Sequence, residues 1–474
     1  MDDMKKFVAR ETELTNLNEM YQSPNFEMAV VYGRRRVGKT SLIKEFIKNK
    51  PSIYIQGIEA TKELNLQYLS DAIMDFENPG RINTHFSFND FRDAFTEVEN
   101  IANNQKEKLV FVLDEFPYFA ESAPEVSSIL QYTIDHIYKE YNNVMLILCG
   151  SSMSFMEHQV LGIKSPLYGR RTGQFKIRPF NIFDTKKMLP DIDNEDLLAY
   201  YGITGGVPQY LTFIDQRITV SENINKLFLK QNAPLQNETN ILLQEELRKP
   251  ATYYSILVAI ANGKTKVNKI YQAIGLKSSS QLSPYLNKLM ELEIIERKSP
   301  ILDTNSKNGI YAIKDNMFKF WFKFISGEQD QIALGRTNGV LEAIMKELPR
   351  FLGPIFEQAS MDWLWKQSEL PFEPRSIKSW WGYNPVLKRQ DEIDIVAVNF
   401  DNSEAIVGEC KWRNSDKLSR EMLTTLRNRA ELFGEKNTIK NKYLYFFVKK
   451  DNNDFKERAK KQNVRVISYG DFFD

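Results

Sequence analysis

The sequence predicts an α/β protein that is divided into several domains. Its 474 residues are more than one hydrophobic core usually organises. The octapeptide Gly33–Thr40 (GRRRVGKT) lies between a short apolar run and a segment whose apolar residues have helical spacing. Near the other end, Glu409 and Lys411 lie two residues apart in an apolar stretch. These observations indicate two functional regions, far apart in the chain, joined by further domains.

The composition limits where the protein acts. With 42% hydrophobic and 26% charged residues, the chain has the composition of a globular protein in water. No apolar run approaches the roughly 20 residues that cross a bilayer, and the first ten residues lack the apolar core of a signal peptide. The two cysteines, Cys149 and Cys410, allow no disulfide framework, and the three histidines are too widely spaced to suggest a zinc site. We therefore expect a cytoplasmic protein with no membrane partner.

The octapeptide fits G-x-x-x-x-G-K-[S/T], the phosphate-binding loop (P-loop) between a strand and a helix. Glu27–Tyr32 has the composition of the buried strand, and Ser41–Lys48 continues as the helix. In such a loop the backbone N–H groups and the helix N-terminus point at one anion. Lys39 is expected to reach the β- and γ-phosphates of ATP, and Thr40 to ligate Mg²⁺. The predicted nucleotide-binding residues of this segment are Gly33, Arg34, Arg35, Arg36, Val37, Gly38, Lys39, Thr40 and Ser41.

Two further apolar strands end in polar residues that suit ATP hydrolysis. Leu109–Glu115 (LVFVLDE) ends in Asp114, expected to hold the Mg²⁺ shell, and Glu115, expected to polarise the attacking water. Val144–Cys149 is followed by Ser151, a small polar residue that can sense the γ-phosphate or the water. Because ligands bind at the carboxyl edge of a doubly wound sheet, these side chains belong to one predicted site.

At this point the sequence resembles the AAA+ and STAND branches of the P-loop ATPases. Phe7–Leu14 (FVARETEL) is similar to the Arg-Glu box that lies against the adenine in these families. The resemblance implies that Arg10 and Glu11 contribute to nucleotide binding. It also makes Arg170 and Arg171 candidate phosphate-sensing cations. The alternative for this arginine pair is an ordinary solvated surface.

A Gly-x-Pro motif extends the resemblance. Gly206 and Pro208 (in GGVPQYL) are similar to the motif found in STAND lids, although Gly-Pro pairs also mark ordinary turns. Together, the motifs resemble those of the prokaryotic archaeal-type ATPase family, which are STAND-like proteins with a C-terminal nuclease-like domain.

The middle of the chain is predicted to be helical and then to change character. Residues 181–250 contain short amphipathic pieces, which suit a helical lid over the nucleotide. Residues 251–330 are predicted to contain three helices and two short strands, over Tyr253–Ala261, Val267–Ile274, Ser280–Leu292, Ile294–Lys298 and Ile310–Ile313. This order is that of a winged helix, whose third helix can enter a DNA major groove. Since that helix lacks a strong basic stripe, a winged helix that faces protein is the alternative.

Two apolar strands in the last part of the chain carry two acids and a lysine. Asp394 lies in Leu387–Phe400, and Glu409 and Lys411 lie in Ala405–Trp412, with a turn between the two strands. Glu409 and Lys411 leave the same face of their strand, since side chains two apart do so. With Asp394 opposite, the carboxylates can hold Mg²⁺ or Mn²⁺, and the ammonium can orient water. The arrangement suits metal-dependent hydrolysis of a phosphodiester.

The pattern Asp394…Glu409-x-Lys411 resembles the PD-(D/E)XK restriction-endonuclease-like core. Glu357, in a helix predicted over Pro354–Lys366, matches the additional acid that this superfamily often places on its first helix. The resemblance implies catalytic roles for all four residues. Two alternatives stay open: an ion pair between strands on a solvated face, and a nuclease fold that binds nucleic acid without cutting it.

The sequence thus predicts a P-loop ATPase core (residues 1–180), a helical lid (181–250), a winged helix (251–330) and an α/β nuclease-like domain (331–474). The expected function is an ATP-driven switch coupled to metal-dependent cleavage of DNA or RNA. The alternative is a regulatory or signalling ATPase whose winged-helix and nuclease-like domains only bind nucleic acid or protein. Partner proteins and self-association are compatible with either function.

Overall fold

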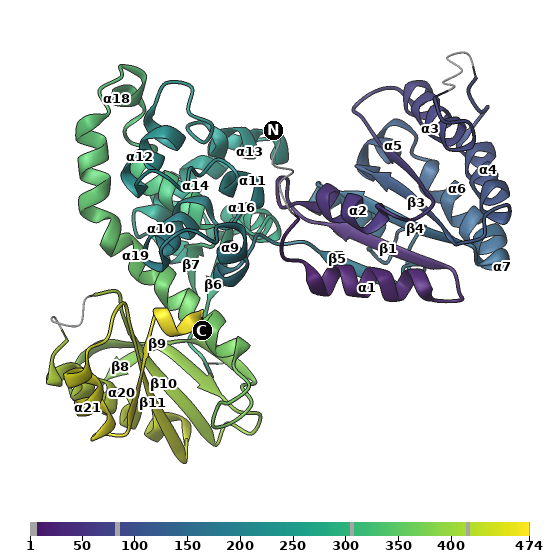
Figure 1. Ribbon diagram of the computed structural model, residues 1–474. Coiled ribbons are helices and arrows are strands. Elements are labelled where there is room, and N and C mark those ends of the chain that lie inside the picture. The colour runs from purple at the N-terminus through teal and green to yellow at the C-terminus, as the bar shows by residue number, and fades with distance from the viewer. Residues whose placement is uncertain (1–6, 81–85, 304–307, 414–417, 474) are drawn as a thin grey trace. The chain divides into compact units, whose positions relative to one another are not determined.

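Figure 1 shows the computed structural model, which describes residues 7–80, 86–303, 308–413 and 418–473. The chain separates into two compact units, Met1–Pro179 and Phe180–Asp474. The first unit is an α/β domain, and the second combines a mainly helical part with a five-stranded sheet. The finer division into four domains stays a prediction.

The first unit is built on a parallel sheet of five strands in the order β2-β3-β4-β1-β5. The strand predicted over Glu27–Tyr32 is confirmed, while β3 ends at Asp114 and β4 continues to Gly150. Because the strands are parallel, their carboxyl ends meet at one edge of the sheet. The strands are β1 (Glu27–Tyr32), β2 (Ser52–Gln56), β3 (Leu109–Asp114), β4 (Val144–Gly150) and β5 (Gly173–Lys176).

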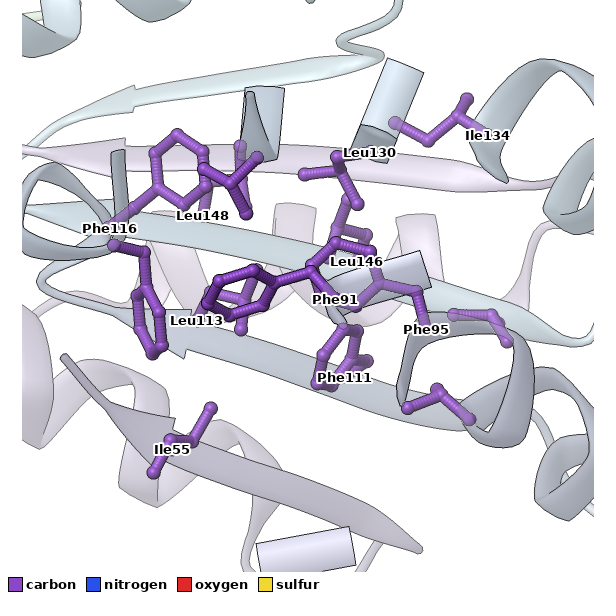
Figure 2. Close-up of a cluster of buried hydrophobic side chains, with 14 of the residues drawn as sticks. Ile55, Phe91, Phe95, Phe111, Leu113, Phe116, Leu130, Ile134, Leu146 and Leu148 are labelled. Carbon is purple, nitrogen blue, oxygen red and sulfur yellow. The ribbon is translucent and has the colours of Figure 1, made fainter. Parts of the chain in front are cut away.

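Helices cover both faces of this sheet. Successive side chains of a strand point to opposite faces, and they enter two different hydrophobic clusters. Val110 and Val112 belong to the cluster with α1 and α2, whereas Phe111 and Leu113 face α3 to α6. Figure 2 shows this second cluster, in which the ring of Phe95 lies 5.9 Å from that of Phe111. The helices are α1 (Glu11–Gln22), α2 (Lys39–Ile47), α3 (Lys62–Glu77), α4 (Phe91–Asn103), α5 (Phe116–Ser122), α6 (Val126–Thr133), η1 (Ile134–Tyr138), α7 (Lys139–Tyr141), α8 (Met153–Phe155) and η2 (Met156–Val160).

The second unit begins with a helical part that contains one short hairpin. Its strands β6 and β7 pair antiparallel, and the aromatic segment Phe318–Phe324 is helical with all its rings buried. The identity of this region as a lid and a winged helix stays a prediction. Its elements are α9 (Ile182–Met188), α10 (Asn194–Thr204), α11 (Pro208–Leu211), α12 (Val220–Ile224), η3 (Asn225–Leu229), α13 (Glu238–Glu246), α14 (Pro250–Ala261), α15 (Val267–Ala273), α16 (Ser279–Glu291), β6 (Ile295–Lys298), β7 (Ile310–Ile313), α17 (Asn316–Phe320), η5 (Trp321–Ile325) and α18 (Gln329–Ala333).

The second unit ends in a mixed sheet with the strand order β12-β11-β10-β9-β8. Strands β8, β9 and β10 are antiparallel neighbours, while β10, β11 and β12 run parallel. Helices α20 and α21 share one hydrophobic cluster with the sheet. Phe356 and Trp363 of α19 contact Trp412 and Phe447. The elements are α19 (Asn338–Lys366), β8 (Ser376–Asn384), β9 (Arg389–Val398), β10 (Glu404–Lys411), α20 (Arg420–Asn437), β11 (Asn441–Val448), α21 (Asn453–Lys460), β12 (Val464–Ser468) and η7 (Gly470–Phe472).

Helix α19 is longer than the sequence predicts. It begins at Asn338 and continues through two prolines, Pro349 and Pro354, although each costs about 3 kcal/mol in a helix interior. Its buried residues include Val340, Ile344 and Leu348, which recur every four positions along the helix. Packing of this apolar stripe therefore outweighs the local cost of the prolines.

Gly206 holds the segment where the second unit begins. Its φ of +67° is left-handed, and its carbonyl accepts a hydrogen bond of 2.8 Å from the Phe180 N–H. A Cβ at this position would lie 2.1 Å from the Phe180 carbonyl oxygen. Pro208 follows as the first residue of α11, where its missing N–H removes no helical bond. The predicted Gly-x-Pro motif has a structural role here, and a role in nucleotide binding stays a prediction.

Gly206→Ala is expected to lower the free energy of unfolding by more than Gly263→Ala does. Both glycines have a left-handed φ, +67° and +80°, which costs alanine about 1–2 kcal/mol. An added Cβ at Gly263 would have nothing within 4 Å, so only the change at Gly206 adds a collision with backbone. Chemical denaturation of both variants measures the difference. Equal losses would contradict the structural role of Gly206.

Candidate functional site

The P-loop connects β1 to α2 through two glycines that the backbone requires. A Cβ on Gly33 would lie 2.2 Å from the carbonyl oxygen of Ile177. Gly38 precedes α2 with a left-handed φ of 92°. These conformations bring the N-terminus of α2 to the loop, where its positive dipole end suits an anion.

Two consecutive side chains connect the loop to its surroundings. The buried Lys39 donates from Nζ to the carbonyl oxygens of Gly33 at 2.9 Å and Arg34 at 3.1 Å. Thr40 donates from Oγ1 to Oδ2 of Asp114 at 3.0 Å. The structure therefore brings together the lysine, the hydroxyl and the acid that the sequence assigned to phosphate and Mg²⁺. Oxygen atoms are the ligands that Mg²⁺ prefers, so Thr40 and Asp114 fit that cation.

The remaining P-loop residues lie as follows. Arg35 donates from Nη2 to the Tyr118 hydroxyl at 3.2 Å, and Arg36 has a left-handed φ of 73°. Val37 is buried, and Ser41 is exposed in the first turn of α2. Ser41 is the one member of the predicted set that faces solvent in this structure.

Tyr54 is a partner of Asp114 that the sequence did not indicate. Its hydroxyl donates to Oδ2 of Asp114 at 2.6 Å, from the neighbouring strand β2. Burial, with the hydrogen bond and negative charge of Asp114, raises the pKa of Tyr54 well above its usual range. Asp114 is 1% exposed, so it depends on these donors for its charge. A tyrosine in an apolar strand gave no signal, because strand tyrosines usually serve packing.

Glu115 is held by Ser151 at the end of the adjacent strand. Its Oε2 accepts hydrogen bonds from the Ser151 N–H at 3.0 Å and hydroxyl at 2.8 Å. Glu115 itself has a left-handed φ of 48°, a costly conformation for a residue with a side chain. The two residues predicted to handle the attacking water thus form one hydrogen-bonded pair.

The predicted Arg-Glu box lies against the P-loop. Arg10 donates from Nη2 to the carbonyl oxygen of Val37 at 3.3 Å and to that of Arg178. Glu11 is the first residue of α1, directly after Arg10. The contact gives Arg10 a role in holding the loop backbone, and contact with adenine stays a prediction.

The two candidate sensor arginines contact residues outside the P-loop. Arg170 forms an ion pair of 2.5 Å with Asp135, and its other guanidinium bonds reach the carbonyl oxygens of Pro166 and Tyr168. Arg171 donates to the Leu161 carbonyl at 3.3 Å. The structure does not bring either residue together with Lys39 within the part of the chain that it describes, so their sensing role stays a prediction.

The carboxylates and the lysine of the second unit converge as expected from the strand pairing. Strands β9 and β10 pair antiparallel, and the Cys410 N–H donates to Oδ2 of Asp394 at 2.8 Å. The Nζ of Lys411 lies 2.5 Å from Oε1 of Glu409 and 3.8 Å from Oδ2 of Asp394. Two acids and one cation thus lie close together. We call Asp394, Glu409, Lys411 and Glu357 the carboxylate cluster.

Glu357 projects from α19 and belongs electrostatically to this cluster. Burial and the nearby Asp394 raise the pKa of Glu357 to about 8. Burial and the neighbouring Glu409 raise the pKa of Asp394 to about 6. Positive charge from Lys298 and Lys411 opposes the rise at Glu357. The crowded negative charge is the property that a cation would compensate.

Arg429 is a member of the cluster that sequence reasoning missed. Its guanidinium lies 2.7 Å from Oε2 of Glu409 and 2.9 Å from Oδ1 of Asp391. Asn384 donates to the other oxygen of Asp391 at 3.0 Å. Arg429 lies in the polar helix α20, where arginines are common on solvated faces, so no pattern marked it.

The described residues contain no group of three or more His, Cys, Asp or Glu side chains that could hold a metal ion. Both oxygens of Glu409 already have cationic partners, Lys411 and Arg429. Asp394 and Glu409 nevertheless offer the carboxylate oxygens that Mg²⁺ and Mn²⁺ prefer. Among the described helices, none is long and apolar enough to cross a membrane.

Comparison with known proteins agrees with the nucleotide site. Residues 7–214 match the family described as an ATPase domain predominantly from Archaea, and residues 321–426 match archaeal and bacterial proteins of unknown function. The uncharacterized protein MJECL04 of Methanocaldococcus jannaschii is 34% identical over 433 residues, which cover 90% of this chain and 92% of that protein. The uncharacterized ATP-binding protein MJ0423 of the same organism is 48% identical over 44 residues, 9% of this chain and 75% of that protein.

Among solved structures, the Walker-type ATPase PABY2304 of Pyrococcus abyssi is similar with a TM-score of 0.52 and 20% sequence identity. The likeness covers 68% of this chain and 97% of that chain, and at this identity it concerns the fold alone. The fold and the family matches together define a P-loop ATPase. The chain belongs to the archaeal-type ATPase family, in which the ATPase domain is followed by the C-terminal domain of unknown function.

Lys39→Ala is expected to lower the rate of ATP hydrolysis by about 10²–10³-fold, since the variant lacks the buried cation that the sequence assigns to the phosphates. Lys48→Ala is the matched control, because Lys48 is exposed at the end of the same helix and pairs only with Glu45 among the described ion pairs. Phosphate release from ATP measures both variants. An unchanged rate in Lys39→Ala would contradict the assigned P-loop site.

Proposed function

We propose that the protein is an ATP-hydrolysing switch whose C-terminal part cleaves DNA or RNA with a divalent metal ion. The observation that carries the proposal is the convergence of Asp394, Glu409 and Lys411, with Lys411 Nζ within 3.8 Å of both carboxylates. Metal-assisted hydrolysis of a phosphodiester needs such oxygen ligands and a cation that counters developing charge. The resemblance of this pattern to a restriction-endonuclease-like core supports the same reaction.

The residues of the cluster have separate tasks in the proposed cleavage. Asp394 and Glu409 would hold Mg²⁺ or Mn²⁺, which when bound supplies Lewis-acid activation of the phosphate and of water. Lys411 orients the attacking water and counters the negative charge that develops on the phosphate. Glu357 adds a carboxyl whose raised pKa suits proton transfer near neutral pH. Arg429 keeps Glu409 oriented through its ion pair.

In the first unit we assign ATP to the P-loop. Lys39 would contact the β- and γ-phosphates, and Thr40 with Asp114 would hold Mg²⁺. Glu115 accepts a proton from the attacking water, and its hydrogen bonds to Ser151 keep the carboxylate oriented for that step. ATP and ADP can shift a conformational equilibrium only by binding one state more tightly than the other. The ATP site is therefore the proposed input, and the carboxylate cluster the proposed output.

A second candidate function is a regulatory ATPase whose C-terminal part binds nucleic acid or protein without cutting. The ion pairs of Glu409 with Lys411 and Arg429 favour it, because they already neutralise that carboxylate. The cluster would then act as a buried ionic network that stabilises the sheet, with binding made by other surfaces.

Asp394→Asn and Lys411→Met are each expected to lower nucleic-acid cleavage in Mg²⁺ or Mn²⁺ by on the order of 10²–10³-fold. Each change removes one charge of the cluster while keeping side-chain size. Lys442→Met is the matched control, since Lys442 lies in the same sheet but pairs with the exposed Glu431 at 2.6 Å. Cleavage of labelled DNA and RNA, with ATPase rate measured in parallel, gives the readout.

The results separate the two functions. Cleavage that persists in both cluster variants would remove the carboxylate cluster from the reaction. Nucleic-acid binding without cleavage in any nucleotide state would instead support the second function, particularly if binding weakens with salt.

A further inference from the structure

Residues 299–303, which follow β6, contribute to the hydrophobic core of the C-terminal sheet. Ile301, which lies in this segment, is 3% exposed and shares a cluster with Trp380 and Ile393. Its N–H donates to the carbonyl oxygen of Ser379, in strand β8, at 3.0 Å. A segment of the helical part is therefore packed and hydrogen-bonded inside the sheet domain.

Ser379 lies opposite an irregularity in the neighbouring strand. Lys378 pairs with Val396, and Trp380 pairs with Ile393. Between these two pairs, β8 has one residue, Ser379, whereas β9 has two residues. Two residues opposite one is the pattern of a β-bulge, which interrupts the ladder and re-aims side chains.

The two residues of the bulge are Asp394 and Ile395. Ile393 and Val396 enter the same hydrophobic cluster although they are three positions apart, which a regular strand does not allow. The bulge thus interrupts the alternation of side chains between the two faces of the sheet at Asp394 and Ile395. Asp394 gains its hydrogen bond from the Cys410 N–H at this point, at 2.8 Å.

The same hairpin also contributes charge. Lys298, the last residue of β6, opposes the raised pKa of Glu357. The contact that links this segment to the carboxylate cluster is that of Ile301, beside the bulge.

We propose that Ile301 is a positioning residue for Asp394 of the carboxylate cluster. Ile301 fills the core beside Trp380 and Ile393, and its N–H donates to the Ser379 carbonyl opposite the bulge, which keeps the bulge in the shape that aims Asp394. Loss of the Ile301 side chain would open a cavity there. The bulge would then relax, and Asp394 would lose its alignment with Glu409 and Lys411. This role rests on the proposed nuclease function.

The test compares two cavities in one hydrophobic cluster. Ile301→Ala removes the docked side chain, and Ile439→Ala removes an isoleucine of the same cluster that lies before β11. Ile301→Val is the conservative variant. Amide hydrogen exchange of residues 376–398 reports on the bulge, and kcat and KM for nucleic-acid cleavage report on Asp394. ATPase rate confirms that the first unit is intact.

Ile301→Ala should raise exchange in residues 376–398 and lower kcat by about tenfold or more with KM unchanged, because misalignment affects the reacting geometry. Ile301→Val should restore both towards wild type, and Ile439→Ala should leave both near wild type. Unchanged exchange in Ile301→Ala, or equal effects of the two alanine variants, would overturn the proposal. If the wild-type protein cleaves nothing, the nuclease function fails, and the exchange data alone decide whether Ile301 holds the bulge.

Discussion

A carboxylate in a protein interior needs hydrogen-bond donors or positive charge, because an unpaired buried charge costs several kcal/mol. This requirement arranges both candidate sites. Asp114 is enclosed by the hydroxyls of Thr40 and Tyr54, and Glu409 by Lys411 and Arg429. Lys411 lies on the same strand as Glu409, but Thr40, Tyr54 and Arg429 come from other elements, so the fold must be complete before the charges are satisfied. Each candidate site can therefore form only when the domain that holds it is folded.

The sequence predicted those parts whose signals are local. The P-loop, the strand ending in Asp114 and Glu115, and the antiparallel pair with its acid-x-lysine pattern all combine a short motif with a flanking apolar run. Strand pairing then determines which side chains lie close together, since parallel strands align their carboxyl ends and residues of antiparallel neighbours lie opposite each other. That is why Ser151 meets Glu115.

The sequence could not predict contacts that depend on irregular or long-range geometry. Tyr54 reaches Asp114 from a neighbouring strand, and Arg429 reaches Glu409 from a helix whose polar residues resemble any solvated surface. The bulge at Asp394 has no residue signature, because it follows from packing of Ile393 and Val396 into one cluster. The predicted helix began at Pro354, whereas α19 begins at Asn338, because packing of its apolar stripe carries the helix through Pro349 and Pro354.

A switch needs a physical route by which one site can bias another. The covalent route from the first unit enters the second at Phe180, whose N–H is bound by the Gly206 carbonyl. Within the second unit the contacts between the sheet and the helical part include Ile301, the ring contact of Phe183 with Phe473, and ion pairs of Lys449 and Lys450 with Glu195 at 2.6 and 2.8 Å. Several attachments resist rotation better than one, so a movement that starts at Phe180 would carry helices and sheet together.

That rigidity separates two ways in which the carboxylate cluster could be controlled. Movement of the helices and the sheet of the second unit together would leave Asp394 aligned with Glu409 and Lys411. Loss of the Ile301 contact would disturb the bulge at Asp394. The ion pair of the exposed Lys450 with Glu195 contributes little energy, whereas a buried isoleucine contributes about 2 kcal/mol or more. The hydrophobic contact of Ile301 is therefore a stronger attachment than this ion pair, and it is the attachment that lies beside the bulge at Asp394.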